Sequence, residues 1–159
     1  MGHRLTLDVQ KWTATVALDG ERPISLSLTA SVDSLQVLSG DGGVTPVTPV
    51  DKAAIRRNAL KSVHAADHPH VTFEADTFEP AADGFDLSGV LTNNGASKRH
   101  EIHVFVTMTE TGWTLAADSS VIQSDFEIKP YSLMVGALRV GDEVTIEFKA
   151  NVARTSITD

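Results

Sequence analysis

The 159-residue sequence contains no cysteine. Disulfides, thiolate nucleophiles and Cys-based zinc or iron–sulfur sites are therefore excluded. The sequence also lacks any apolar run long enough to cross a bilayer. Its first residues, Met1–Val9, alternate like a strand instead of forming the apolar stretch of a secretory signal. We therefore expect a cytoplasmic protein that does not insert into a membrane.

Positive charge is scarce, because 13 Lys and Arg residues oppose 21 Asp and Glu residues and give a formal net charge of −8. A nucleic-acid partner requires a basic surface, so the sequence predicts no nucleic-acid partner. The hydrophobic content of 42% is ordinary for a soluble protein. The length predicts one domain, residues 1–159, with a single core.

What the sequence does contain is a regular alternation of apolar and polar residues. In residues 143–152, Val144, Ile146 and Phe148 begin an apolar row at every second position, and polar residues fill the positions between. Strict alternation is typical of an antiparallel strand with one buried face. The pattern recurs at residues 5–18, 24–30, 71–75, 85–91, 98–109 and 113–117. We therefore predict an all-β fold, an antiparallel barrel of about eight strands.

One segment, about residues 50–64, has helical spacing instead. Thr48 supplies a hydroxyl cap, Pro49 is favoured at the first helical position, and Pro69 prevents continuation. The apolar positions are Ile55, Ala59, Leu60 and Val63. A single amphipathic helix has only the barrel to pack on, so we expect this inserted helix to cover a barrel end or seam.

The histidines and the catalytic motifs give no support for an enzyme. His64, His68 and His70 suggest a metal site near the helix end, but a solvated helix terminus is the favoured explanation, because no fixed carboxylate or thiolate ligand accompanies them. His100-Glu101-Ile102-His103 looks superficially like a zinc-protease motif, but its spacing is one residue short, and residues three apart on a strand face opposite ways. Nucleophile-elbow, phosphate-loop and dinucleotide-binding motifs do not occur in the sequence. We predict no enzyme, no metal and no cofactor.

Several segments, in this order and spacing, resemble the YceI-like family of lipocalin-type barrels, which is associated with polyisoprenoid lipids. They are Gly2-His3 with Trp12, Ser31–Leu35, Asn58–Leu60, His70–Phe73, Phe85–Leu91 with Gly95, Ser124–Ile128 and Leu138–Val144. The resemblance covers nearly the whole chain. It implies an eight-stranded lipocalin-like barrel with one inserted helix and an elongated apolar interior for an isoprenoid chain.

The sequence departs from the family pattern at its start. Family members usually have another strand before the Gly-His pair, whereas this sequence begins at Met1-Gly2-His3. We expect the domain to lack the family's first strand, which would leave an open seam in the barrel. An unpaired edge invites strand addition, so we predict a homodimer that closes the seam.

The interior of such a barrel is either filled by its own side chains or hollow enough to hold one ligand. The residues alone favour a filled core, and the resemblance favours a lipid cavity. Inward positions predicted to contact the ligand are Trp12, Phe73, Phe85, Leu87, Val104, Phe126, Ile128, Tyr131, Leu133 and Phe148. The Tyr131 hydroxyl would face a polar head group at the mouth, or Tyr131 is a plain core or rim residue.

The predicted function is therefore non-enzymatic binding and carrying of a long apolar lipid, isoprenoid or quinone-like, in the barrel interior. A second hypothesis is a solid-core structural or interaction protein that uses its open edge or its acidic surface. A third, less favoured, is a histidine-based metal site in the 64–70 region.

Overall fold

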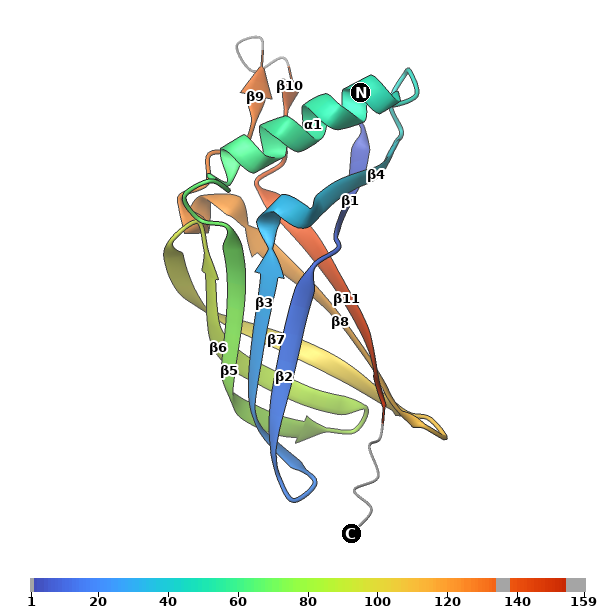
Figure 1. Cartoon of the computed structure of the whole chain (residues 1–159), viewed down its shortest axis with the longest axis vertical. Coiled ribbons are helices and arrows are strands. Elements are labelled where there is room, and N and C mark those ends of the chain that lie inside the picture. The colour runs from blue at the N-terminus through green and yellow to red at the C-terminus, as the bar shows by residue number, and fades with distance from the viewer. Residues whose placement is uncertain (1, 134–137, 154–159) are drawn as a thin grey trace.

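Seven antiparallel strands form one curled sheet in the order β11-β8-β7-β6-β5-β3-β2 (Figure 1). The structure, a computed structural model, describes residues 2–133 and 138–153. The strands of this sheet are β2 (Trp12–Asp19), β3 (Arg22–Ser31), β5 (His70–Ala81), β6 (Gly84–Asn93), β7 (Ala96–Met108), β8 (Gly112–Ile122) and β11 (Glu143–Ala153). The sheet curls into a half-barrel, which confirms the predicted all-β, antiparallel, lipocalin-like fold.

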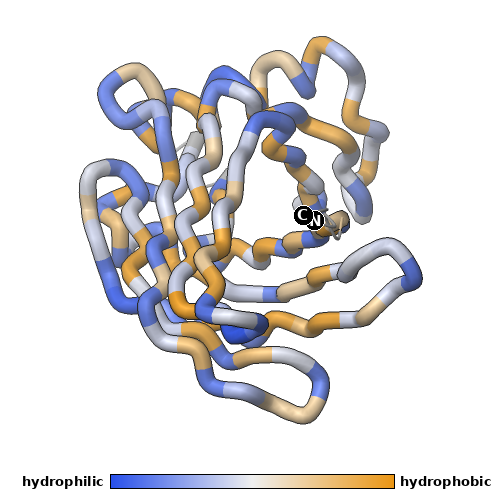
Figure 2. Tube along the Cα trace, turned by 60° about the horizontal axis from the view of Figure 1, so that its bottom comes forward, coloured by the Kyte–Doolittle hydropathy of each residue, from blue (hydrophilic) through white to orange (hydrophobic). Residues whose placement is uncertain are grey.

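The chain curls around a central axis when it is viewed toward its lower end (Figure 2). Apolar and polar residues alternate along the strands in that view, as the sequence predicted. Alternate side chains point to opposite faces of a strand, so the curl separates a concave face from a convex face. Asn94 and Gly95 both have positive φ in the turn between β6 and β7, the backbone conformation that a tight hairpin turn requires.

Strands β1 (Arg4–Val9) and β4 (Leu35–Asp41) form a separate two-stranded ladder beyond the end of the β2–β3 hairpin. A kink separates the two ladders at Lys11 and at the short helix η1 (Val32–Ser34). The Ser34 hydroxyl accepts a hydrogen bond from the Lys11 backbone N–H at 2.9 Å and donates one to the Ser31 carbonyl at 2.7 Å. The kink therefore satisfies backbone groups that the interrupted ladder leaves unpaired.

The predicted helix is present as α1 (Pro49–Ser62) and lies across one end of the sheet beside β4 (Figure 1). Thr48 caps it: its hydroxyl accepts from the Asp51 N–H at 3.2 Å, and the Asp51 carboxylate accepts from the Thr48 N–H at 2.8 Å. Two basic side chains hold the helix against β4, because Lys52 and Arg56 donate to the carbonyls of Leu38 and Leu35.

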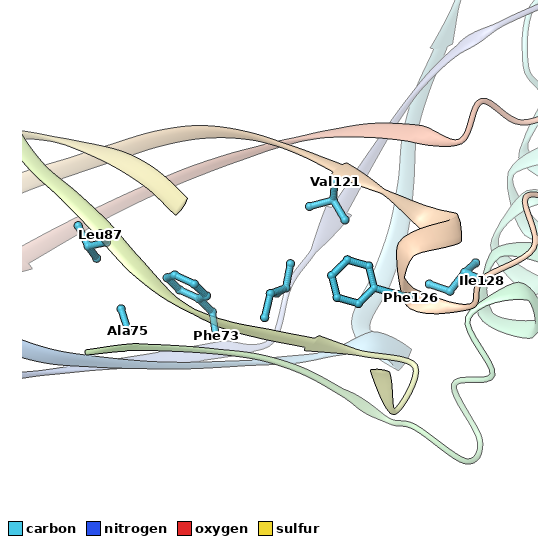
Figure 3. Close-up of a cluster of buried hydrophobic side chains, with 7 residues drawn as sticks. Phe73, Ala75, Leu87, Val121, Phe126 and Ile128 are labelled. Carbon is cyan, nitrogen blue, oxygen red and sulfur yellow. The ribbon is translucent and has the colours of Figure 1, made fainter. Parts of the chain in front are cut away.

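The buried core lies on the concave face (Figure 3). Its members are Phe73, Ala75, Leu87, Leu91, Val121, Phe126 and Ile128. They come from β5, β6 and β8, and from the short helix η2 (Gln123–Phe126) with the segment that follows it. The core is therefore concentrated on the central strands and on η2. The two-residue strands β9 (Ser132–Leu133) and β10 (Leu138–Arg139) pair beyond it.

Candidate functional site

Cross-strand register identifies the side chains that share the concave face with the core. Val16 of β2 pairs with Leu26, and Leu26 pairs with the buried Ala75. At the other side of the sheet, Phe148 of β11 pairs with Ala117, which in turn pairs with Val104. Directly paired residues point to the same face, so the predicted apolar rows of both edge strands line the concave face.

These edge-strand side chains remain accessible although they lie on the concave face. Their exposed fractions are 41% for Trp12, 40% for Val16, 57% for Leu18, 39% for Val144, 47% for Ile146 and 42% for Val152. A barrel filled by its own side chains would bury these apolar groups, as it buries Phe73 and Leu87. The concave face is thus packed over the central strands and open along both edges.

The two edges of the sheet approach each other at one aromatic contact. No ladder joins β2 to β11 in the described ranges, so each has one unpaired side there. The rings of Trp12 and Phe148 nevertheless meet with centroids 5.1 Å apart and an interplanar angle of 65°. This edge-to-face geometry is favourable for aromatic pairs. The seam is bridged there by side chains instead of by backbone hydrogen bonds.

The sequence-predicted ligand residues divide between the core and the open edges. Phe73, Leu87, Phe126 and Ile128 are buried core residues. Phe85 and Val104 pack against that core. Trp12 and Phe148 meet at the seam, Tyr131 is half-buried, and Leu133 lies in β9 with its side chain outside the described residues.

The prediction omitted several of the most accessible apolar residues of the concave face. These residues are Val16, Leu18, Val144, Ile146 and Val152. They alternate with polar residues in the sequence, but the predicted ligand residues are mainly aromatic residues and residues of the central strands. They are exposed because, within the described ranges, β2 and β11 do not pair and the sheet stays open. The alternation within a single strand does not indicate whether the sheet closes.

A polar pair interrupts the apolar concave face. His100 Nε2 and Ser119 Oγ lie 2.6 Å apart, and the His100 ring meets the Phe73 ring edge to face with centroids 6.3 Å apart. Burial lowers the pKa of His100, because the charged imidazolium loses hydration there. The imidazole is therefore neutral at pH 7. No local sequence pattern indicates this pair, since only the fold brings Ser119 and His100 together.

His103 faces the opposite way, as the strand spacing predicted. Its Nδ1 lies 2.6 Å from an Asp86 carboxylate oxygen and its Nε2 lies 2.9 Å from one of Asp83. The Asp86 hydrogen bond, followed by the Asp83 charge, raises the pKa of His103. His100 and His103 therefore cannot bind one metal ion together.

The helix-end histidines also have other contacts. His64 Nδ1 lies 2.9 Å from the Asn94 side-chain oxygen. Within residues 2–133 and 138–153, no group of three or more His, Cys, Asp or Glu side chains is arranged to hold a metal ion. In the same ranges, no helix is both long and apolar enough to cross a membrane.

Two surface hollows differ in character from the concave face. One, of about 320 Å³, is lined mainly by polar residues of the convex face: Thr77, Glu79, Asp86, Leu87, Ser88, Glu101, Ile102 and His103. The other, of about 430 Å³, lies at the kink: Gln10, Lys11, Trp12, Thr13, Thr29, Ser31 and His70 line it. Neither has the continuous apolar lining that a long hydrocarbon requires.

A curled antiparallel sheet with an accessible apolar concave face and one helix across its end defines a lipocalin-like binding protein. The sequence model of the YceI-like domain matches residues 2–152, so the chain belongs to the YceI-like family. This membership confirms the family resemblance predicted from the sequence.

Solved structures of family members share the fold at low sequence identity. The YceI protein of Campylobacter jejuni has a TM-score of 0.71 and 13% identity, covering 96% of this chain and 86% of that chain. BcnA of Burkholderia cenocepacia has a TM-score of 0.69 and 20% identity, covering 90% and 84% respectively. No curated protein matched the sequence.

Proposed function

We propose that this protein binds and carries a long apolar lipid, isoprenoid or quinone-like, on its concave face, without catalysing a reaction. The observation that supports the proposal most directly is the row of half-exposed apolar side chains on β2 and β11. Such a row costs free energy in water, and an apolar ligand laid along it would remove that cost. Membership of a family of lipocalin-like binding proteins agrees with this function.

Hydrophobic burial alone is sufficient for useful affinity. Each buried CH₂ contributes roughly 0.8 kcal/mol, so several isoprene units supply well over ten kcal/mol in gross terms. Association and chain ordering cost roughly 4–15 kcal/mol. The balance corresponds to a dissociation constant near micromolar, about −8 kcal/mol. A charged clamp is unnecessary, and discrimination would depend on the length and girth of the chain.

The ten predicted ligand residues take three roles in this proposal. Trp12 and Phe148 contact the ligand at the seam, together with the accessible residues Val16, Ile146 and Val152. The buried members and the two half-buried residues packed against them form the floor against which the ligand lies. They are Phe73, Phe85, Leu87, Val104, Phe126 and Ile128, and Tyr131 and Leu133 are proposed to lie near the mouth.

Mass spectrometry of organic extracts from purified protein tests the proposal. Polyprenyl or prenylated-quinone species should copurify with the unaltered chain. Ile146→Glu places a charge on the accessible concave face and should abolish recovery of lipid, because a buried unpaired carboxylate is costly. Thr145→Glu, one residue earlier on the convex face of the same strand, is the control and should leave recovery unchanged. Absence of lipid from the unaltered chain, with no binding of added lipid, would contradict the proposal.

A second proposal concerns the two unpaired strand edges. We infer that two copies associate along the seam and form a homodimer, because β2 and β11 each offer unpaired backbone groups and exposed apolar side chains. Light scattering across a concentration series tests this. A monomer at the highest concentration would refute the dimer and leave the lipid proposal intact.

The cytoplasmic location stays a prediction from the sequence. Fractionation of cells that express the full-length gene product tests it, with recovery outside the cytoplasm as the contradicting result.

A further inference from the structure

Strands β7 and β8 separate part of the way along the sheet. Their ladder runs from the Met108–Trp113 pair to the Val104–Ala117 pair and stops there. Beyond it, residues 96–103 of β7 pair with β6, and residues 118–122 of β8 pair with β11. The hydrogen bond between His100 and Ser119, at 2.6 Å, crosses this divergence on the concave side.

The His100 ring uses only one of its two nitrogens in this bond. Among the described residues, no hydrogen bond involves its Nδ1. In the same part of the chain, every fully buried side-chain nitrogen or oxygen has a partner, so Nδ1 retains accessible surface. Ser119 pairs with Ile146, whose side chain is 47% exposed on the concave face. The His100 side chain therefore lies on the concave side, next to the β8–β11 pair that carries the accessible Ile146.

We infer that His100 Nδ1 is a specificity-determining hydrogen-bonding site that takes one uncharged oxygen, a carbonyl or a hydroxyl, of an otherwise apolar ligand. This inference rests on the proposed lipid-binding function. It adds to that function a preferred ligand chemistry and the residue that selects it.

The chemistry of the site favours a neutral oxygen over a phosphate. A neutral imidazole donates from Nδ1 in one tautomer and accepts there in the other, so it matches a carbonyl or a hydroxyl. A phosphate requires positive charge, and burial keeps His100 neutral at pH 7. Lys98, two residues away on the same face of β7, is engaged by the Asp125 carboxylate at 3.3 Å. The net charge of −8 opposes a phosphate further.

The expected effect is a modest but measurable selectivity. One hydrogen bond gained in exchange for water contributes a factor of about two to ten in affinity. The benefit appears only for a ligand that carries the oxygen. A hydrocarbon of the same length gains nothing from it, and therefore serves as an internal reference for the hydrophobic contribution.

Competition binding with two probes tests the inference. The probes are a prenylated benzoquinone and the polyprene hydrocarbon with the same number of isoprene units. The unaltered protein should prefer the quinone about two- to tenfold. His100→Phe keeps an aromatic ring beside Phe73 but removes both nitrogens, so the two affinities should become equal. His103→Phe, the same change on the opposite face of β7, should retain the preference.

The outcomes separate this inference from the function on which it rests. An unchanged quinone preference in His100→Phe, and in His100→Leu if the first variant does not fold, would overturn the inference and leave the pair a bridge between strands. Equal binding of both probes by the unaltered protein would overturn it too, with lipid binding intact. Binding of neither probe by the unaltered protein would overturn both proposals.

Discussion

Trp12 and Phe148 join the two unpaired edges of the sheet, with their ring centroids 5.1 Å apart. They come from opposite ends of the strand order, β2 and β11, and from opposite ends of the chain. A contact between the first and last strands of the sheet replaces the ladder that would close a complete barrel. At this point the two edges meet through side chains and not through backbone hydrogen bonds.

A double-mutant cycle on this pair measures how strongly it holds the seam. Trp12→Ala and Phe148→Ala should each lower the free energy of unfolding, and the coupling between them should be about 0.5–1.5 kcal/mol. Urea denaturation of the four proteins provides the measurement. Strictly additive effects would show that the rings do not stabilise each other in solution.

Truncation of the core should be far more costly than truncation of an exposed ring. Phe126 is 3% exposed and packs with the core from η2, so Phe126→Ala should lower the free energy of unfolding by about 3–5 kcal/mol. Phe105, 43% exposed on β7, is the matched control, and its alanine variant should lose much less. Equal losses measured by thermal or urea denaturation would place the core elsewhere.

His103 should make stability decline as the pH rises. Its pKa in the folded state is raised above 6.5, chiefly by the Asp86 hydrogen bond, so the folded protein binds the proton more tightly than the unfolded chain. The stabilisation is fully present below pH 6.5 and is lost as the pH rises through the folded-state pKa. The stability difference between the unaltered protein and His103→Gln should follow that profile. A pH-independent difference would contradict it.

His100 should act in the opposite direction. Burial lowers its folded-state pKa below 6.5, so the unfolded chain binds the proton more tightly. The contribution of neutral His100 is present above pH 6.5 and is lost as the pH falls toward the folded-state pKa. Nuclear magnetic resonance titration of the two imidazoles measures both values directly. A His100 pKa at or above that of His103 would refute the assignment.

Local patterns predicted those parts of the fold that local chemistry decides. The alternation in residues 143–152 corresponds to β11, and the predicted helix start at Thr48-Pro49 corresponds to the capped end of α1. Each of these features depends on neighbouring residues alone. The family resemblance supplied the inserted helix and the curled sheet as one architecture, and the domain match over residues 2–152 confirmed it.

Features that depend on distant parts of the chain were not predictable in this way. Val16 and Phe73 both lie on apolar rows, yet one is 40% exposed and the other 6%. Their difference comes from the distance of each strand from the sheet edge. The His100–Ser119 bond likewise requires β7 and β8 to separate, and each strand alone gives no sign of that divergence.

The core is concentrated on the central strands and η2. The residues that keep the protein folded are therefore mostly different from the accessible apolar residues on β2 and β11. Apart from Trp12 and Phe148, the accessible side chains of β2 and β11 lie outside the buried core, so substitutions there should cost little stability. The chemistry of the accessible concave surface is therefore open to change at the two edge strands, while the central strands and η2 keep the molecule folded.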